Sequence, residues 1–132
     1  MSDFVEFNEG ANYIAEHGWP NPVYFLLSAS PVGVLTATST LAGGVGEISG
    51  TGYERQSQPL PTVIGGVLAF ATMYFTTGLA VDWPHDVVSL VAVTTLNNSG
   101  IALCAWNLQP NGTPRDMAAV STTEQVTPTY IF

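Results

Sequence analysis

The sequence contains no lysine and only two arginines, Arg55 and Arg115, among 132 residues. Ten acidic residues bring the formal net charge to −8 at pH 7. Proteins bind nucleic acid largely through Lys and Arg, which displace the counterions of the phosphates. Two arginines cannot form such a basic surface, and the same shortage argues against an anionic membrane surface. We therefore expect neither nucleic acid nor a membrane as a partner.

Charged residues of both signs make up only 9% of the chain, whereas hydrophobic residues make up 46%. A typical domain surface carries about a quarter to a third of charged side chains. The surface must instead consist of uncharged polar residues or be covered by another protein. The composition therefore favours a component of an assembly over a catalyst.

Cysteine and long apolar runs are also scarce. The single cysteine, Cys104, has no second thiol with which to form a disulfide, and its apolar neighbours are typical of a small buried side chain. No stretch approaches the roughly 18 apolar residues of a transmembrane helix. A single domain over residues 1–132 is expected, and a chain of this length forms a core without disulfide or metal.

Residues 3–18 are predicted to hold a short helix. Asp3 begins a capping-box pattern, and Asn8 is a second possible N-cap. Gly10 weakens such a helix by about 1 kcal/mol relative to alanine. Gly18 is suited to end it, and the prolines that follow prevent its continuation.

Short apolar runs separated by turn signals fill residues 22–126. Runs rich in aromatic and β-branched residues predict strands, here at residues 23–29, 52–57, 67–75, 87–95, 101–108 and 118–126. Between the first two lies a segment rich in Gly, Ser and Thr, and loops of such length are usually functional or only partly ordered. The pattern predicts a mainly β fold, an antiparallel β-sandwich or a jelly-roll-like barrel with a short N-terminal helix.

Few residues suit catalysis. His85 lies near Asp82 and Asp86, which together suggest a metal site or an acid–base pair. A polar turn is the interpretation we favour, because a catalytic histidine normally has a nucleophile and an orienting group beside it. No metal-binding or phosphate-binding motif is present. We expect no enzymatic activity, no cofactor, no metal and no small-molecule substrate.

Arg55 stands out in a chain that hardly uses arginine. Its guanidinium suits a structural hydrogen-bond network or a bidentate pair with a carboxylate. One arginine alone performs no reaction, so we favour the structural role.

The C-terminal tail, residues 127–132, ends on Tyr130, Ile131 and Phe132. Free termini are usually polar and frayed unless they are held in place. The tail therefore either completes the domain's own sheet or inserts into a neighbour. Our hypothesis is that it docks on a partner, so that deletion of residues 128–132 would release the protein and leave its circular dichroism unchanged.

Three short motifs occur in a characteristic order. Residues 52–56 (Gly52, Tyr53, Glu54, Arg55, Gln56) fit the pattern Gly-Gly-Tyr-x-Arg-Gln, with Thr51 in place of one glycine. Trp83 precedes a predicted strand, with Pro84 where the pattern has glycine. A hairpin at Gly100 then leads into a Leu-containing return strand.

This order resembles a widespread family of small tailed-phage virion proteins, many labelled tail fibre protein and some of them capsid decoration or cement proteins. The resemblance covers most of residues 9–108, fades after Gln109 and implies no catalytic residues. It implies a virion structural protein, assembled in the bacterial host cytoplasm. We expect a minor capsid protein that decorates the outside of the major capsid protein lattice, with copies of itself in trimers or other multimers as further partners. The alternative is a tail fibre or tail-tip protein that contacts the host surface, with aromatic side chains stacked on glycans.

Overall fold

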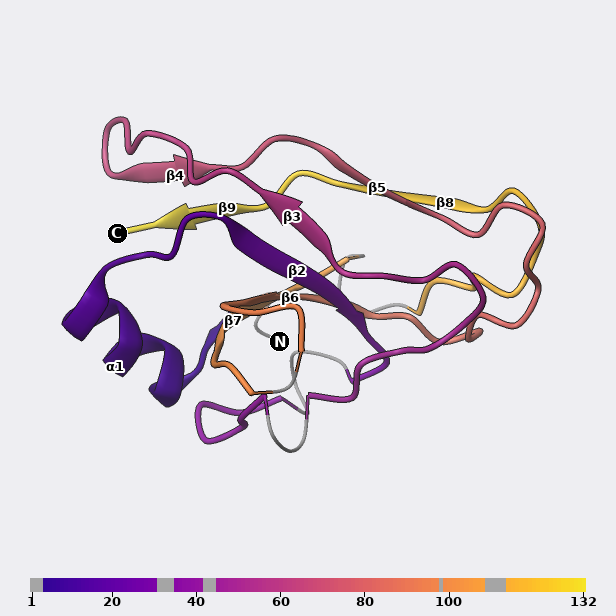
Figure 1. Cartoon of the computed structure of the whole chain (residues 1–132), viewed down its shortest axis with the longest axis horizontal. Helices are drawn as coiled ribbons and strands as arrows, with labels where there is room; N and C mark the ends of the chain where they lie inside the picture. Colours follow the sequence, from indigo (N-terminus) through magenta and orange to yellow (C-terminus); the bar gives the residue numbers. More distant parts are fainter. Residues whose placement is uncertain (1–3, 31–34, 42–44, 98, 109–113) are drawn as a thin grey trace.

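The computed structural model describes residues 4–30, 35–41, 45–97, 99–108 and 114–132. Over these residues the chain forms one short helix and nine antiparallel strands, so the predicted mainly β class is confirmed (Figure 1). The described strands form open sheets that do not close into a barrel. In chain order the elements are β1 (Phe4–Glu6), α1 (Asn8–His17), β2 (Val23–Ser28), β3 (Gln56–Gln58), β4 (Val67–Ala69), β5 (Met73–Thr76), β6 (Ser89–Val93), β7 (Ala102–Asn107), β8 (Thr123–Val126) and β9 (Thr129–Ile131).

The central layer is a five-stranded antiparallel sheet in the order β1-β7-β6-β2-β3. A strand with one face in water normally alternates apolar and polar residues. Here all five residues of β6 are buried, and β2 and β7 each contain four consecutive buried residues. The chain therefore covers this sheet on both faces, which explains the continuous apolar runs of the sequence.

The second layer is a long two-stranded ribbon in which β4 pairs with β9 and β5 with β8. Ala69 pairs with Thr129 and Met73 with Val126, so the first strand has three residues between these pairs where the second has two. One extra residue on one strand is a β-bulge, which bends and twists the pair. The ribbon runs along the top of Figure 1. It contributes four residues to the core of the sandwich: Leu68, Phe70, Met73 and Phe75.

The other face of the central sheet is covered by the segment that the sequence presents as a long loop. Leu35, Leu41 and Val45 are buried there against residues of β2, β6 and β7. This part of the loop is thus a component of the core. Residues 31–34 and 42–44 lie outside the described residues.

Helix α1 is close to its prediction, but the segment before it is not. Residues Phe4–Glu6 form strand β1 and pair with β7, instead of belonging to a helical region that begins at residue 3. Asn8 is the first helical residue and Phe7 occupies the N-cap without a side-chain hydrogen bond; Asp3 lies outside the described residues. The apolar character of Phe4 and Phe7 prevails over the capping pattern, because both pack against the sheet.

Three other boundaries differ from the prediction. Of residues 52–57 only the last two are in a strand, because Gly52 forms a turn with φ of 77°. The bulge divides residues 67–75 into β4 and β5, and the last predicted strand begins only at Thr123. The tail, which the sequence allows either to complete the domain's own sheet or to insert into a neighbour, contains β9 and belongs to the ribbon.

Candidate docking surface

Exposed apolar side chains gather where the β4 end of the ribbon meets the C-terminus. We define the C-terminal patch as the residues Val63, Ile64, Ile131 and Phe132, which are 46%, 76%, 75% and 62% exposed. The turn before β4 lies beside β9, because Val67 pairs with Ile131 and the N–H of Phe132 donates to the carbonyl of Gly66 at 2.9 Å (Figure 1). Clusters of exposed apolar side chains mark interaction sites.

Strand β9, which carries part of this patch, is firmly held. Tyr130 turns inward, and its hydroxyl donates a hydrogen bond to the carboxylate of Glu6. Its ring meets the ring of Trp19 edge to face, with centroids 5.0 Å apart. The indole N–H of Trp106 donates to the carbonyl of Thr129 at 2.8 Å. Burial and the Glu6 carboxylate raise the pKa of Tyr130, so its hydroxyl remains a donor.

The structure therefore separates the three predicted contact residues. Tyr130 anchors β9 to the domain, whereas Ile131 and Phe132 remain largely exposed and available to a partner. The ring of Phe132 lies edge to face on that of Tyr130, with centroids 5.0 Å apart. Of the two alternatives for the tail, it completes the domain's own sheet. A deletion of residues 128–132 would remove β9, so an unchanged circular dichroism no longer follows. The sequence offers no signal for Val63 and Ile64, which only the pairing of β4 with β9 brings to the tail.

A second group of exposed apolar residues lies at the far end of the ribbon. Leu79, Val81 and Val120 are 91%, 61% and 54% exposed. The N–H of Ser121 donates to the carbonyl of Gly78, which places the two turns together. We call these three residues the turn group.

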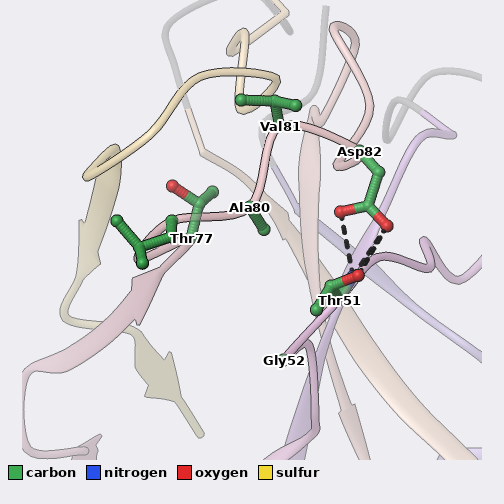
Figure 2. Close-up of a pocket in the computed structure, with 7 residues that line it drawn as sticks. Thr51, Gly52, Thr77, Ala80, Val81 and Asp82 are labelled. Carbon is green, nitrogen blue, oxygen red and sulfur yellow. Dashed lines mark hydrogen bonds between the residues drawn. The ribbon is translucent and has the colours of Figure 1, made fainter.

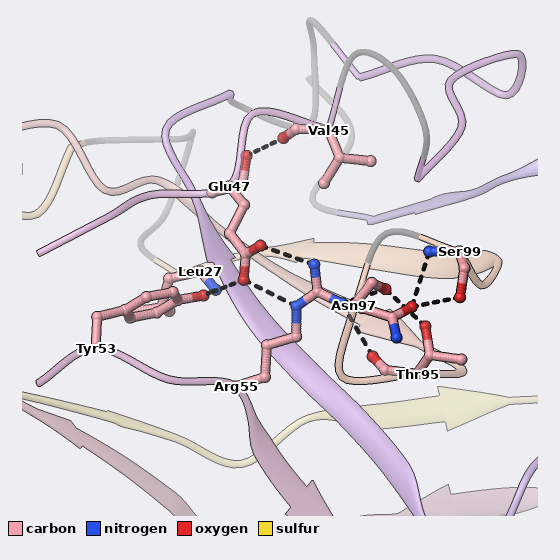
Figure 3. Close-up of polar contacts among 9 residues, drawn as sticks. Leu27, Val45, Glu47, Tyr53, Arg55, Thr95, Asn97 and Ser99 are labelled. Atoms are coloured by element: carbon pink, nitrogen blue, oxygen red, sulfur yellow. Dashed lines mark hydrogen bonds and ion pairs between the residues drawn. The ribbon is translucent and has the colours of Figure 1, made fainter.

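Arg55 makes the bidentate pair that its guanidinium suggests (Figure 3). Nε and Nη2 donate to the two carboxylate oxygens of Glu47 at 2.9 and 2.7 Å. Nη1 donates to the carbonyls of Thr95 and Asn97, both at 2.9 Å. The side chain of Arg55 is only 5% exposed, so it ties three chain segments together and offers no face to a substrate.

Tyr53 extends this network toward the sheet. Its hydroxyl donates to Glu47 at 2.8 Å and accepts the N–H of Leu27 at 3.1 Å. Burial raises the pKa of Tyr53, which keeps the phenol protonated. The two aromatic rings of the motif region also meet, since the rings of Tyr53 and Trp83 lie edge to face with centroids 5.4 Å apart.

The remaining motif residues have steric roles. The indole N–H of Trp83 donates to the carbonyl of Thr51 at 2.8 Å. A Cβ at Gly50 would lie 2.4 Å from the Trp83 ring, so the turn at 50–52 accepts only glycine there. Gln56 opens β3 opposite Phe25. Gly100 lies in the β6–β7 hairpin, where a Cβ would be 2.3 Å from the hydroxyl of Thr95.

An open pocket of about 450 Å³ lies between the turn at 50–52 and residues 77–82 (Figure 2). Its one carboxylate, Asp82, accepts the N–H of Thr51 at 3.0 and 3.1 Å and its hydroxyl at 2.8 Å. These hydrogen bonds lower the pKa of Asp82. The carboxylate is thus used to hold a turn, and the pocket residues include no nucleophile activated by a base.

His85 does not join Asp82. Its Nδ1 lies 3.0 Å from Oδ1 of Asp116, and both side chains are largely exposed. The hydrogen bond raises the pKa of His85 and lowers that of Asp116. Burial raises the pKa of the Cys104 thiol, which is fully enclosed. Among the described residues, no three His, Cys, Asp or Glu side chains form a group able to hold a metal ion.

Within the described part of the chain, no helix has the length and apolar character needed to cross a membrane. Comparison with family models, with curated proteins and with solved structures gives no match for this chain.

Proposed function

We propose that this chain is a structural protein of a tailed-phage virion, and specifically a decoration or cement protein on the outer surface of the capsid. The observation that carries the proposal is the C-terminal patch, a group of large exposed apolar residues on the turn before β4 and on the end of the well-anchored strand β9. In a chain with only 9% charged residues, such a patch favours adhesion to another protein. The resemblance of its three short motifs to those of the virion family directs the proposal to the phage particle.

The mechanism is burial of this patch against the major capsid protein. Apolar surface contributes about 25 cal/mol for each Å² removed from water. A patch of four side chains gives a modest single contact, which becomes effective when many copies occupy a repeating shell. Copies of the same chain, in trimers or other multimers, are the second partner of this proposal.

The polar clusters support an adhesive role over a catalytic one. Glu47 is engaged by Arg55 and Tyr53, and Asp82 by Thr51. His85 pairs with Asp116 in the open, without a nucleophile beside it. Each cluster stabilises a turn or joins two segments, which is the behaviour of a scaffold.

The copy number in purified particles tests the virion role. Quantitative mass spectrometry against the major capsid protein should give hundreds of copies if the protein decorates the shell. A handful of copies would support a tail fibre or tail-tip protein that contacts the host instead. Absence from particles of the phage that encodes the chain would contradict a virion role altogether.

Paired substitutions test the docking surface. Ile131→Ser with Phe132→Ser should weaken binding to capsids stripped of this protein by at least about tenfold, the equivalent of 1.4 kcal/mol. Leu79→Ser with Val120→Ser, in the turn group, is the matched control and should bind normally. Circular dichroism should be the same for both proteins. Normal binding by the first variant would exclude the C-terminal patch as the contact.

A further inference from the structure

Strand edges expose unpaired N–H and C=O groups, and folded proteins usually guard them with charge, proline or short length. Three of the four outer edges in the described structure are guarded in this way. β1 includes the charged residue Glu6, and β3 is followed directly by Pro59. On the β8–β9 edge Pro128 interrupts the strand, and two carbonyls are taken by side chains.

The β5 part of the β4–β5 edge has neither a charge nor a proline. At β4 the outward N–H and C=O of Val67 are already paired with Ile64, so the open part of this edge lies at β5. Residues 67–77 read Val-Leu-Ala-Phe-Ala-Thr-Met-Tyr-Phe-Thr-Thr, without a charge, a proline or a glycine. Tyr74 is 56% exposed, and Thr76 is exposed as well. A strand with this composition and an open edge is a template for pairing with another strand.

The alternation of hydrogen bonds between β5 and β8 shows which backbone groups of β5 point away from the ribbon. The N–H of Thr77 donates to the carbonyl of Thr122 at 2.9 Å, so the pair 77/122 is a hydrogen-bonded pair of the ribbon. Such pairs alternate with pairs whose backbone groups face away from the partner strand. Tyr74 and Thr76 are therefore in the outward set, and among the described residues neither makes a backbone hydrogen bond on that side.

We propose that two copies of this chain pair through the β4–β5 edge, antiparallel about a two-fold axis near Phe75. Tyr74 of one copy then lies opposite Thr76 of the other, and the outward N–H and C=O groups of both residues are satisfied. Because the axis is two-fold, the same surface serves both chains. The two ribbons become one four-stranded sheet, in the order β8-β5-β5-β8.

A second copy fits this edge because the edge itself carries no charge. Each chain carries a net charge of −8, so two copies repel one another over most surfaces. The β4–β5 edge is free of charge over eleven consecutive residues and places no carboxylate opposite another. A two-stranded sheet is also marginal on its own, and widening it to four strands adds cross-strand contacts.

The pairing rests on the self-association part of the proposed function, but it requires no capsid. It is therefore tested on the isolated protein, whereas the virion role is tested on particles. Absence from particles would leave the pairing untouched, and loss of the pairing would leave capsid binding to be decided by its own experiment.

The first experiment uses the unmodified chain. Sedimentation velocity over a concentration series should show a monomer–dimer equilibrium. Amide hydrogen exchange measured by NMR should show protection of Tyr74 and Thr76 that rises with protein concentration. The amide of Gln125, on the opposite edge, should exchange at the same rate throughout. A monomer at every concentration, or a dimer in which Tyr74 and Thr76 still exchange freely, would overturn the proposal.

Matched variants provide the second experiment. Thr76→Lys places a charge on the open edge and should raise the dimer dissociation constant at least about tenfold. Thr123→Lys is the control, because its hydroxyl lies 3.0 Å from that of Thr76 on the same face but on the guarded strand. Both substitutions change the net charge equally. Equal weakening by both, or by neither, would reject the edge as the interface.

Discussion

At the scale of single residues, Glu47 is the centre of the largest polar network described. Its carboxylate accepts hydrogen bonds from Nε and Nη2 of Arg55 and from the hydroxyl of Tyr53. An unpaired charge in a buried position is strongly destabilising, whereas the intact pair contributes little by comparison. The network therefore constrains the fold mainly through the cost of breaking it.

We expect Glu47→Ala to lower the free energy of unfolding by about 2–3 kcal/mol, because Arg55 stays buried without its carboxylate. Urea denaturation monitored by tryptophan fluorescence measures this change. Glu54→Ala is the control, since Glu54 is exposed and precedes Arg55 in the sequence. Its free energy of unfolding should lie within about 0.5 kcal/mol of that of the unmodified protein. Similar losses in both variants would contradict a special role of the Arg55 pair.

The His85–Asp116 pair gives a pH signature. The pKa of His85 is raised above its ordinary 6.5, so its stabilising contribution is full below that value and is lost as the pH rises through the raised pKa. The pKa of Asp116 is lowered from 3.8, so its contribution is lost as the pH falls. The pair therefore contributes most between about pH 4 and 6.5.

An NMR titration of the His85 ring measures this effect directly. Asp116→Asn should bring the pKa of His85 back toward 6.5, because the hydrogen bond to Asp116 is the main cause of the shift. Asp86→Asn should lower the pKa of His85 less, since the charge of Asp86 is the smallest of the causes that raise it. Equal effects of the two substitutions would show that the contact at 3.0 Å does not persist in solution.

At the scale of elements, helix α1 depends on a glycine that looks unfavourable in the sequence. A Cβ at Gly10 would lie 2.4 Å from the carbonyl oxygen of Leu103 and 2.7 Å from that of Ala102. The helix therefore approaches β7 so closely that only glycine fits. The carboxylate of Glu9 uses this approach to accept the N–H groups of Leu41 and Ala102, at 2.9 and 2.7 Å.

We expect Gly10→Ala to lower the free energy of unfolding by about 1–3 kcal/mol, although alanine favours a helix. Asn12→Ala, on the exposed side of the same helix, should raise it by a few tenths of a kcal/mol, about what helix propensity predicts. Thermal and urea denaturation should show changes of opposite sign in the free energy of unfolding of the two variants if the contact of Gly10 with β7 decides the outcome. A stabilising Gly10→Ala would contradict the close packing.

The predictability of these elements follows from the range of the interactions that set them. The apolar runs of β2, β6 and β7 are visible in the sequence because burial on both faces leaves no polar alternation. The bulge between β4 and β5 depends on β8 and β9 and has no local signal. Strand β1 was not predicted, because its local sequence fits a helix-capping pattern and its pairing partner, β7, lies far along the chain.

The same reasoning applies to the site. Arg55 is conspicuous by its rarity, but its partner Glu47 lies in a glycine-rich loop with nothing to distinguish it from other acids. Ile131 and Phe132 could be proposed as contact residues from their apolar character in the sequence. Ile64 could not, because its proximity to the tail comes from strand pairing.

At the scale of the whole molecule, the charge distribution sets the response to salt. The net charge of −8 opposes association, while the proposed β4–β5 interface contains no ion pair for salt to weaken. The Debye length shortens from about 30 Å at 0.01 M salt to about 8 Å at 0.15 M. We expect the dimer to tighten over this range in sedimentation experiments. A dimer that weakens with salt would indicate an interface built on opposite charges.

The ribbon has a consequence for biosynthesis. Val67 pairs with Ile131 and Thr76 with Thr123, so its first strand is made long before its partner. During translation residues 67–77 leave the ribosome as an apolar strand with no sheet to join, a state prone to misassembly. The second layer closes only after residue 131 has been made, and pairings across such a distance in sequence form slowly. Formation of the second layer therefore waits for β8 and β9, and the yield of folded protein depends on how well nascent chains are kept apart until these strands have been made.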